Sequence, residues 1–143
     1  MRNIIFPILA GIFIALQGIF NARLGEKIGF WETNTVVHAT GLTLSIIILT
    51  FAGNGSFLRI GEVNKLYLFG GALGVMIIFS VMKGIAALGA AMTVAVLLVT
   101  QLLVATAIDV FGLFGSTPIK FDYTKLLGLI IMTVGIIVFK IRG

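Results

Sequence analysis

Residues 86–112 decide the fold class of this chain. They read AALGAAMTVAVLLVTQLLVATAIDVFG, and Asp109 is the only charged side chain among them. The apolar core of a bilayer is about 30 Å thick and requires roughly 17–25 predominantly apolar residues in a helix. A helix also satisfies its own backbone hydrogen bonds inside lipid. We therefore interpret residues 86–112 as a transmembrane helix.

Four further apolar runs have the same character, and they cover residues 4–22, 33–52, 66–82 and 123–139. The last run contains Lys125 in its first turn, from where a lysine side chain can extend to the membrane surface. The runs are continuous rather than alternating, which is not typical of a transmembrane β-barrel. The sequence thus predicts an all-α, multi-pass integral membrane protein of the prokaryotic plasma (inner) membrane. We expect a single domain of five transmembrane helices over residues 1–143.

The composition excludes most soluble classes of protein. Of the 143 residues, 59% are hydrophobic and 10% are charged, whereas soluble domains have about 45–50% apolar and about 25% charged residues. The chain has no cysteine, which excludes a disulfide scaffold and a zinc module. Its net charge is +5, but the lysines and arginines are spread between the apolar runs, so we expect no nucleic-acid partner. One histidine and scattered serines form no convincing triad, so we predict no enzyme, catalytic residue, cofactor or metal site.

The basic residues do not favour either side of the membrane. Five spans place the two termini on opposite sides, and the basic residues divide into Arg2, Arg59, Lys65, Lys120 and Lys125 on one side and Arg23, Lys27, Lys83, Lys140 and Arg142 on the other. An excess of Lys and Arg normally marks the cytoplasmic side. This balance has two interpretations. In the first, local features of the loops give every chain the same orientation in the membrane. In the second, the chain inserts in both orientations and two antiparallel copies form a ten-helix dimer with the symmetry of an inverted repeat.

Polar side chains within the spans lie on three helix faces. Residues four apart share one face of a helix. The faces are Gln17 with Asn21, Asn34 with His38, Gly41 and Ser45, and Gln101 with Asp109. We predict that Gln17, Asn21, His38, Gln101 and Asp109 bind the substrate.

Each of these residues also has a structural interpretation. The amides of Gln17, Asn21 and Gln101 could simply hold neighbouring helices together. His38 could be a packed, neutral, hydrogen-bonded side chain. Asp109 either lines a path for substrate or protons, where burial raises the pKa of a carboxyl, or it reaches the membrane surface and pairs with a lysine. The sequence alone leaves these alternatives open.

The chain is rich in glycine, and small residues allow helices to approach closely in lipid. We expect a packing role for Gly11, Gly18, Gly41, Gly70, Gly71, Gly74, Gly128 and Gly135.

Several segments of the chain resemble a known family. They are QGIFNARLG at 17–25, GGALG at 70–74, LGAA at 88–91, Gln101 followed by Asp109, Gly112 and Gly115, and LLG at 126–128 with Gly135. In their order and spacing they are similar to the YdcZ-like family of the drug/metabolite transporter superfamily. The resemblance covers nearly the whole chain. It implies a five-helix unit that occurs as single chains, as paired genes and as fused ten-helix chains. It also implies transport, with Gln17, Asn21, Gln101 and Asp109 as matching positions, but it names no cargo.

These observations favour a small secondary transporter that moves a small polar or amphipathic metabolite or toxicant by alternating access, coupled to protons. We expect its partners to be membrane lipid, the substrate and a second copy in an antiparallel homodimer. Asp109 of one copy would then lie at the depth of Gln17 and His38 of the other. The alternatives are a dual-topology ion channel and a membrane scaffold subunit that transports nothing.

Overall fold

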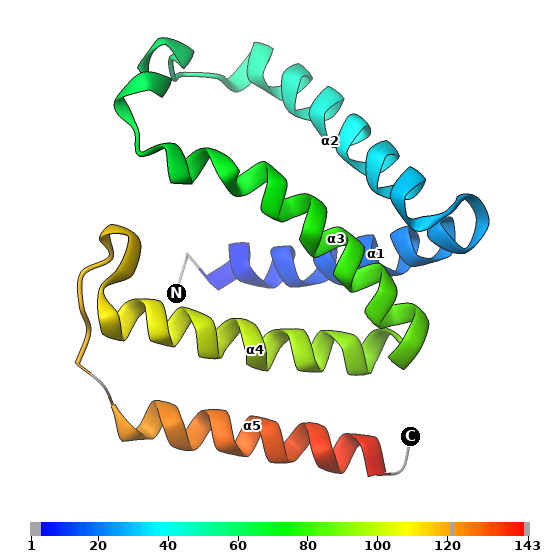
Figure 1. Ribbon diagram of the computed structural model, residues 1–143, viewed down its shortest axis with the longest axis vertical. Helices are drawn as coiled ribbons and strands as arrows, with labels where there is room; N and C mark the ends of the chain where they lie inside the picture. Colours follow the sequence, from blue (N-terminus) through cyan, green and yellow to red (C-terminus); the bar gives the residue numbers. More distant parts are fainter. Residues whose placement is uncertain (1–3, 121, 142–143) are drawn as a thin grey trace. The chain divides into compact units, whose positions relative to one another are not determined.

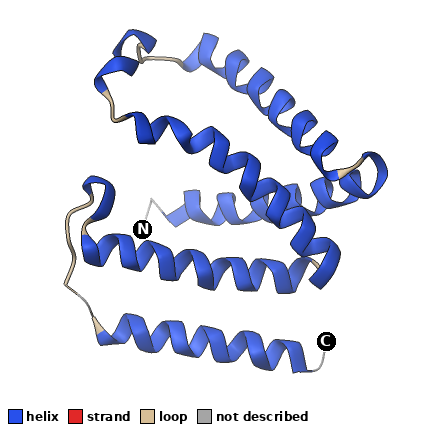
Figure 2. Cartoon of the chain, in the orientation of Figure 1, coloured by secondary structure: helices blue, strands red, loops and turns tan. Residues whose placement is uncertain are grey.

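The computed structural model describes residues 4–120 and 122–141, and every regular element in these ranges is a helix (Figure 2). The long helices are α1 (Ile5–Ile28), α2 (Phe30–Ala52), α3 (Gly70–Leu88), α4 (Ala90–Phe111) and α5 (Tyr123–Ile141). A short 3-10 helix, η3 (Lys65–Phe69), leads directly into α3. With η3 counted as part of the third segment, five segments are long and apolar enough to cross a membrane. The five-helix prediction is confirmed.

The chain forms two compact units, Met1–Ala87 and Leu88–Gly143. The first contains α1, α2 and nearly all of α3. The second contains α4 and α5, which lie antiparallel and side by side (Figure 1). Each unit is therefore described by itself.

The ends of the helices differ from the predicted spans at two places. We expected a connection over residues 23–32, but α1 continues to Ile28 and only Gly29 separates it from α2. The charged residues beyond Ala22 extend the helix, and Arg23 forms an ion pair with Glu26 at 3.2 Å. We also expected the fourth span to begin at residue 86, but residues 86–88 belong to α3 and Gly89, with φ 79°, separates the two helices.

Two other connections are longer. Between α2 and α3 the chain forms the 3-10 helix η2 (Phe57–Glu62), and after α4 it forms η4 (Leu113–Gly115). Side chains cap η2 and η3, because Ser56 Oγ accepts from the N–H of Leu58 at 3.3 Å and Asn64 Oδ1 accepts from the N–H of Leu66 at 3.0 Å. Each cap satisfies a backbone N–H in the first turn of its 3-10 helix.

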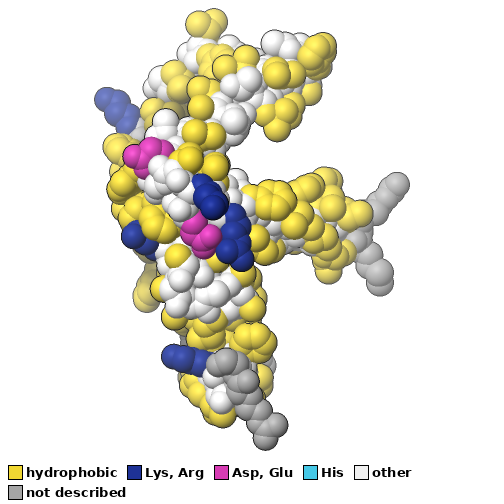
Figure 3. Space-filling model, turned by 90° about the vertical axis from the view of Figure 1, so that its right-hand side faces the viewer, with side chains coloured by type: hydrophobic (Ala, Val, Ile, Leu, Met, Phe, Trp, Pro, Cys, Tyr) yellow, Lys and Arg dark blue, Asp and Glu magenta, His cyan; other side chains and the backbone are white. Residues whose placement is uncertain are grey.

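Few apolar side chains are buried within the described part of the chain. The buried hydrophobic residues are Ala22, Met82, Val99 and Leu129. Hydrophobic side chains make up most of the surface visible in Figure 3. A soluble monomer rarely exposes such extensive apolar surface, whereas lipid covers it without cost. The arrangement is that of helices whose outer faces contact a bilayer.

Candidate functional site

The buried face of α1 consists of small residues and one amide. Its buried members are Gly18, Asn21, Ala22 and Gly25. A Cβ at Gly18 would lie 3.1 Å from Ile85 Cδ1, and one at Gly25 would lie 3.5 Å from Met82 Sδ. Both of these partners belong to α3. Since the glycines have no side chain, they leave room along this face for the Ile85 and Met82 side chains of α3.

Asn21 and Gln17 share one side of α1 as predicted, but their surroundings differ. Asn21 lies on the face buried against α3 and is 7% exposed. Gln17, one turn earlier and near the middle of the helix, is exposed. The amide of Asn21 is therefore enclosed by the first unit, and the amide of Gln17 is not.

Asn34 and His38 join α2 to α3. Asn34 Nδ2 donates a hydrogen bond to the carbonyl oxygen of Val75 at 2.8 Å. His38 Nδ1 lies 3.0 Å from the carbonyl oxygen of Asn34, and because a carbonyl oxygen only accepts, Nδ1 carries the proton. The other ring nitrogen, Nε2, lies 3.4 Å from the position of a Cβ on Gly74. His38 is thus packed against α3, at a glycine that makes room for its ring.

Two buried oxygens in this region have no hydrogen-bond partner in the described residues. They are Thr33 Oγ1 and Asn34 Oδ1. Thr33 is 0% exposed and Asn34 is 3% exposed. Buried polar atoms are nearly always hydrogen-bonded in native proteins, so these two oxygens are the unsatisfied acceptors of this region among the described residues.

The buried polar side chains of the first unit, among the described residues, are Asn21 on α1 and Thr33 and Asn34 on α2, and His38 is half-buried beside Asn34. Sequence reasoning selected Asn21 and His38 and placed Asn34 on the His38 face, but it missed Thr33. The available signal was the polar cluster Glu32–Thr35 directly after Gly29.

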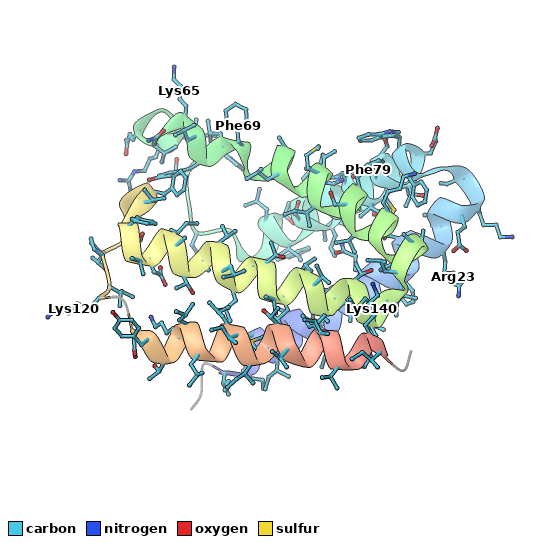
Figure 4. All side chains as sticks on the ribbon, turned by 60° about the horizontal axis from the view of Figure 1, so that its bottom comes forward. Arg23, Lys65, Phe69, Phe79, Lys120 and Lys140 are labelled. Atoms are coloured by element: carbon cyan, nitrogen blue, oxygen red, sulfur yellow. The ribbon has the colours of Figure 1, made fainter. Side chains whose placement is uncertain are left out.

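Aromatic rings hold the start of α2 against α3. Trp31 stacks on Phe79, which is labelled in Figure 4, with ring centroids 4.4 Å apart, and Phe30 meets the same ring edge-on. Lys83 Nζ lies 4.4 Å from the centroid of the Phe30 ring. Trp31 and Lys83 therefore both take part in contacts between α2 and α3.

In the second unit, Gln101 is exposed near the middle of α4, and Asp109 is half-buried near its end. The connection that follows folds back over this end. The N–H of Ile119 donates to the carbonyl oxygen of Asp109 at 3.0 Å, and Ser116 Oγ donates to the carbonyl oxygen of Ile108 at 3.3 Å.

The ion pairs found in the described ranges are Arg23–Glu26 and Arg59–Glu62. The carboxylate of Asp109 therefore has no basic partner among the described residues. Its predicted pairing with a lysine of the connection is not present there.

The predicted packing glycines fall into two groups. Gly18 and Gly74 contact another helix of the first unit. A Cβ would meet open space at Gly11, Gly41, Gly70, Gly71, Gly128 and Gly135. A packing role for this second group remains a prediction, and it would require a surface outside each glycine's own unit.

Comparisons with known proteins agree with this architecture. Residues 3–138 match the model of the family described as "Putative inner membrane exporter, YdcZ". The chain is 29% identical over 140 residues to the inner membrane protein YdcZ of Escherichia coli strain K12, which covers 91% of this chain and 89% of that protein. No solved structure matches the chain. The family match spans nearly all of the chain, and the chain has five apolar helices long enough to cross a membrane. This multi-pass membrane protein therefore belongs to the YdcZ family and has a role in transport.

Proposed function

We propose that this protein is a small secondary transporter that moves a small polar or amphipathic metabolite or toxicant by alternating access. The observation that carries the proposal is the burial of three polar side chains in the first unit, Asn21, Thr33 and Asn34, two of which have an unpartnered oxygen among the described residues. Polar groups inside a membrane protein are costly, and they either hold helices together or line a path for substrate. The unpartnered oxygens of Thr33 and Asn34 are acceptors for a hydroxyl or ammonium group of the cargo.

The working form in this proposal is an antiparallel homodimer. Gln17 and Gln101 lie near the middle of α1 and α4, and both side chains are exposed. An amide facing lipid lacks hydrogen-bond partners, so these residues favour a polar neighbour at mid-membrane. The even division of basic residues between the two sides permits insertion in both orientations, and an antiparallel second copy would bring its own polar groups to the same depth.

Asp109 is the proposed coupling residue. Its carboxylate lacks a basic partner in the described residues and lies in the last turn of α4. In an antiparallel pair, Asp109 of one copy would lie in the same half of the bilayer as Gln17 and His38 of the other. A carboxylate in that position exchanges a proton or cation for the cargo, with His38 as a second titratable group.

The test uses purified protein in proteoliposomes. Compounds are first selected because they raise the thermal unfolding temperature, as ligands of the folded state do, and their uptake is then measured with and without a pH gradient. We expect saturable uptake that the gradient increases. The Asp109→Asn variant should lose the response to the gradient. Asp122→Asn, which changes an exposed acid just before α5, is the matched control.

Two results would overturn the proposal. Ion flux that is much faster and hardly saturates would identify a channel, and absence of any flux would identify a scaffold subunit. Gradient-driven uptake that is unchanged in Asp109→Asn would remove the role assigned to this carboxylate while leaving transport itself intact.

A further inference from the structure

Two connections between long helices have the same backbone form. Gly29 joins α1 to α2 with φ 99° and ψ 152°, and Gly89 joins α3 to α4 with φ 79° and ψ 163°. In each, the N–H of the threonine four residues later donates to the glycine carbonyl, at 3.1 Å for Thr33 and 3.2 Å for Thr93. Residues with a side chain rarely adopt such a φ. We call these two one-residue connections, at Gly29 and at Gly89, elbows.

The elbow at Gly29 is fixed by its surroundings. Its N–H donates to the carbonyl oxygen of Gly25 at 3.0 Å, which ties it to α1. The carboxylate of Glu32 lies against the position that a Cβ would take. Beyond it, Trp31 stacks on Phe79 and so holds the first turn of α2 to α3. All of these contacts lie within the first unit.

The elbow at Gly89 has open space around it, since no atom lies within 4 Å of the position of a Cβ. Thr93 binds its carbonyl oxygen twice, through the N–H at 3.2 Å and through Oγ1 at 2.8 Å. The carbonyl is therefore held by α4, whereas nothing among the described residues packs against the Cβ position of Gly89. The division of the chain into two units falls here as well, between Ala87 and Leu88.

We propose that Gly89 is the hinge about which Met1–Ala87 and Leu88–Gly143 turn during the transport cycle, an inference that rests on the proposed transport function. The two units then move as bodies, while the elbow at Gly29 keeps its shape. Long helices amplify small rotations. A turn of about 15° at one end displaces the other end of a helix about 33 Å long, the length of α4, by about 9 Å. A rotation at a single glycine thus moves the far end of a helix by several ångströms.

The test measures distances between pairs of spin labels, because the chain has no native cysteine. Exposed positions supply one pair within the first unit, one pair within the second and one pair across the units. They are Leu44 with Leu73, Val104 with Ile131, and Leu44 with Ile131. Labelled protein is diluted into an excess of unlabelled protein, so that distances within one chain dominate.

We expect a single narrow distance for each pair within a unit, unchanged between alkaline and acidic buffer. The pair across the units should give a broader distribution whose maximum shifts with pH. The Gly89→Ala variant should narrow this distribution and abolish the shift, because alanine restricts the torsions of the elbow without meeting a neighbour. Gly71→Ala, at a helical glycine that also has open space around it, is the matched control.

A distribution across the units that is as narrow and as constant as those within them would overturn the hinge. This comparison uses protein that retains Gly89, so it tests the hinge even if the Gly89→Ala variant does not fold. It also requires no substrate. A rigid elbow in a protein that transports would refute the hinge alone, whereas a mobile elbow in a protein without flux would refute the transport proposal alone.

Discussion

The side-chain amide of Asn34 donates a hydrogen bond to the backbone carbonyl oxygen of Val75, 2.8 Å away. This carbonyl lies inside α3, so the bond joins the first half of α2 to the neighbouring helix. His38, one turn further along α2, packs against Gly74, the residue next to Val75. Beyond Gly41, α2 is exposed to its end. The contact between α2 and α3 therefore depends on a short region of polar and aromatic residues.

The first prediction concerns this hydrogen bond. Asn34→Ala should destabilise the protein by about 0.6–1.7 kcal/mol, the range measured for hydrogen bonds between membrane helices. Thermal unfolding in detergent checks it. Thr35→Ala is the control, since the hydroxyl of Thr35 binds only the Trp31 carbonyl of its own helix, at 3.0 Å. Equal losses in the two variants would contradict the role given to Asn34.

The second prediction separates two glycines on the same helix. Gly18→Leu should cost about 1–3 kcal/mol, because a larger side chain would collide with Val81 and Ile85. Gly11→Leu should change stability by less than about 0.5 kcal/mol, since a side chain there meets open space within the chain. The same unfolding measurement compares them. A large loss for Gly11→Leu, in protein kept monomeric, would be inconsistent with this packing of α1.

The third prediction concerns orientation. Ser56, before η2, and Ile28, at the end of α1, lie at opposite ends of α2 and are both exposed. A single cysteine at either position, in a chain with no other cysteine, should react with an impermeant reagent from both sides of the membrane. If each position reacts from one side only, and the two positions react from opposite sides, the orientation is fixed and the antiparallel pair is excluded.

The fourth prediction concerns the start of α5. The backbone N–H of Thr124 donates to Asp122 Oδ1 at 2.9 Å and holds the pKa of this carboxyl below its usual value. A lowered pKa in the folded state means that the ionised group stabilises the protein above its unfolded pKa of about 3.9. This contribution is lost as the pH falls through the folded value.

The difference in unfolding temperature between the native chain and Asp122→Asn should therefore shrink on acidification below about pH 3.9. Asparagine keeps an oxygen that accepts from Thr124 but has no charge to lose. A difference that stays constant across this range would show that the charge of Asp122 does not stabilise the helix.

The five helices were predictable because each needs a long apolar run, and such runs are plain in the sequence. The residues at which the helices begin and end were harder to predict. The residues Arg23–Ile28 continue α1 because a helix can extend out of the apolar layer with its charged side chains in water. A span defined by apolar residues alone ends at the first charged side chain, so the predicted first span ended before α1 does.

Part of the candidate site was predictable in the same way. Helical spacing placed Asn34 and His38 on one face, and both do meet α3. Spacing does not say which face of one helix meets which face of another, and so it could not separate buried Asn21 from exposed Gln17. Nor could it distinguish Gly89 from the other seventeen of the 18 glycines, because the φ of a glycine depends on the connection that the folded chain makes at that point.

The one-residue elbows at Gly29 and Gly89 have a consequence for proteolysis. A protease needs several residues in an extended strand, and neither elbow offers them. With five spans, both elbows lie at the same membrane surface, while residues 53–64 and 112–120 emerge at the other. Among the connections between the described helices, those at one surface thus offer a protease no extended segment and those at the other do, so the fraction of chains cut within these connections from outside a sealed vesicle reports how many copies point each way.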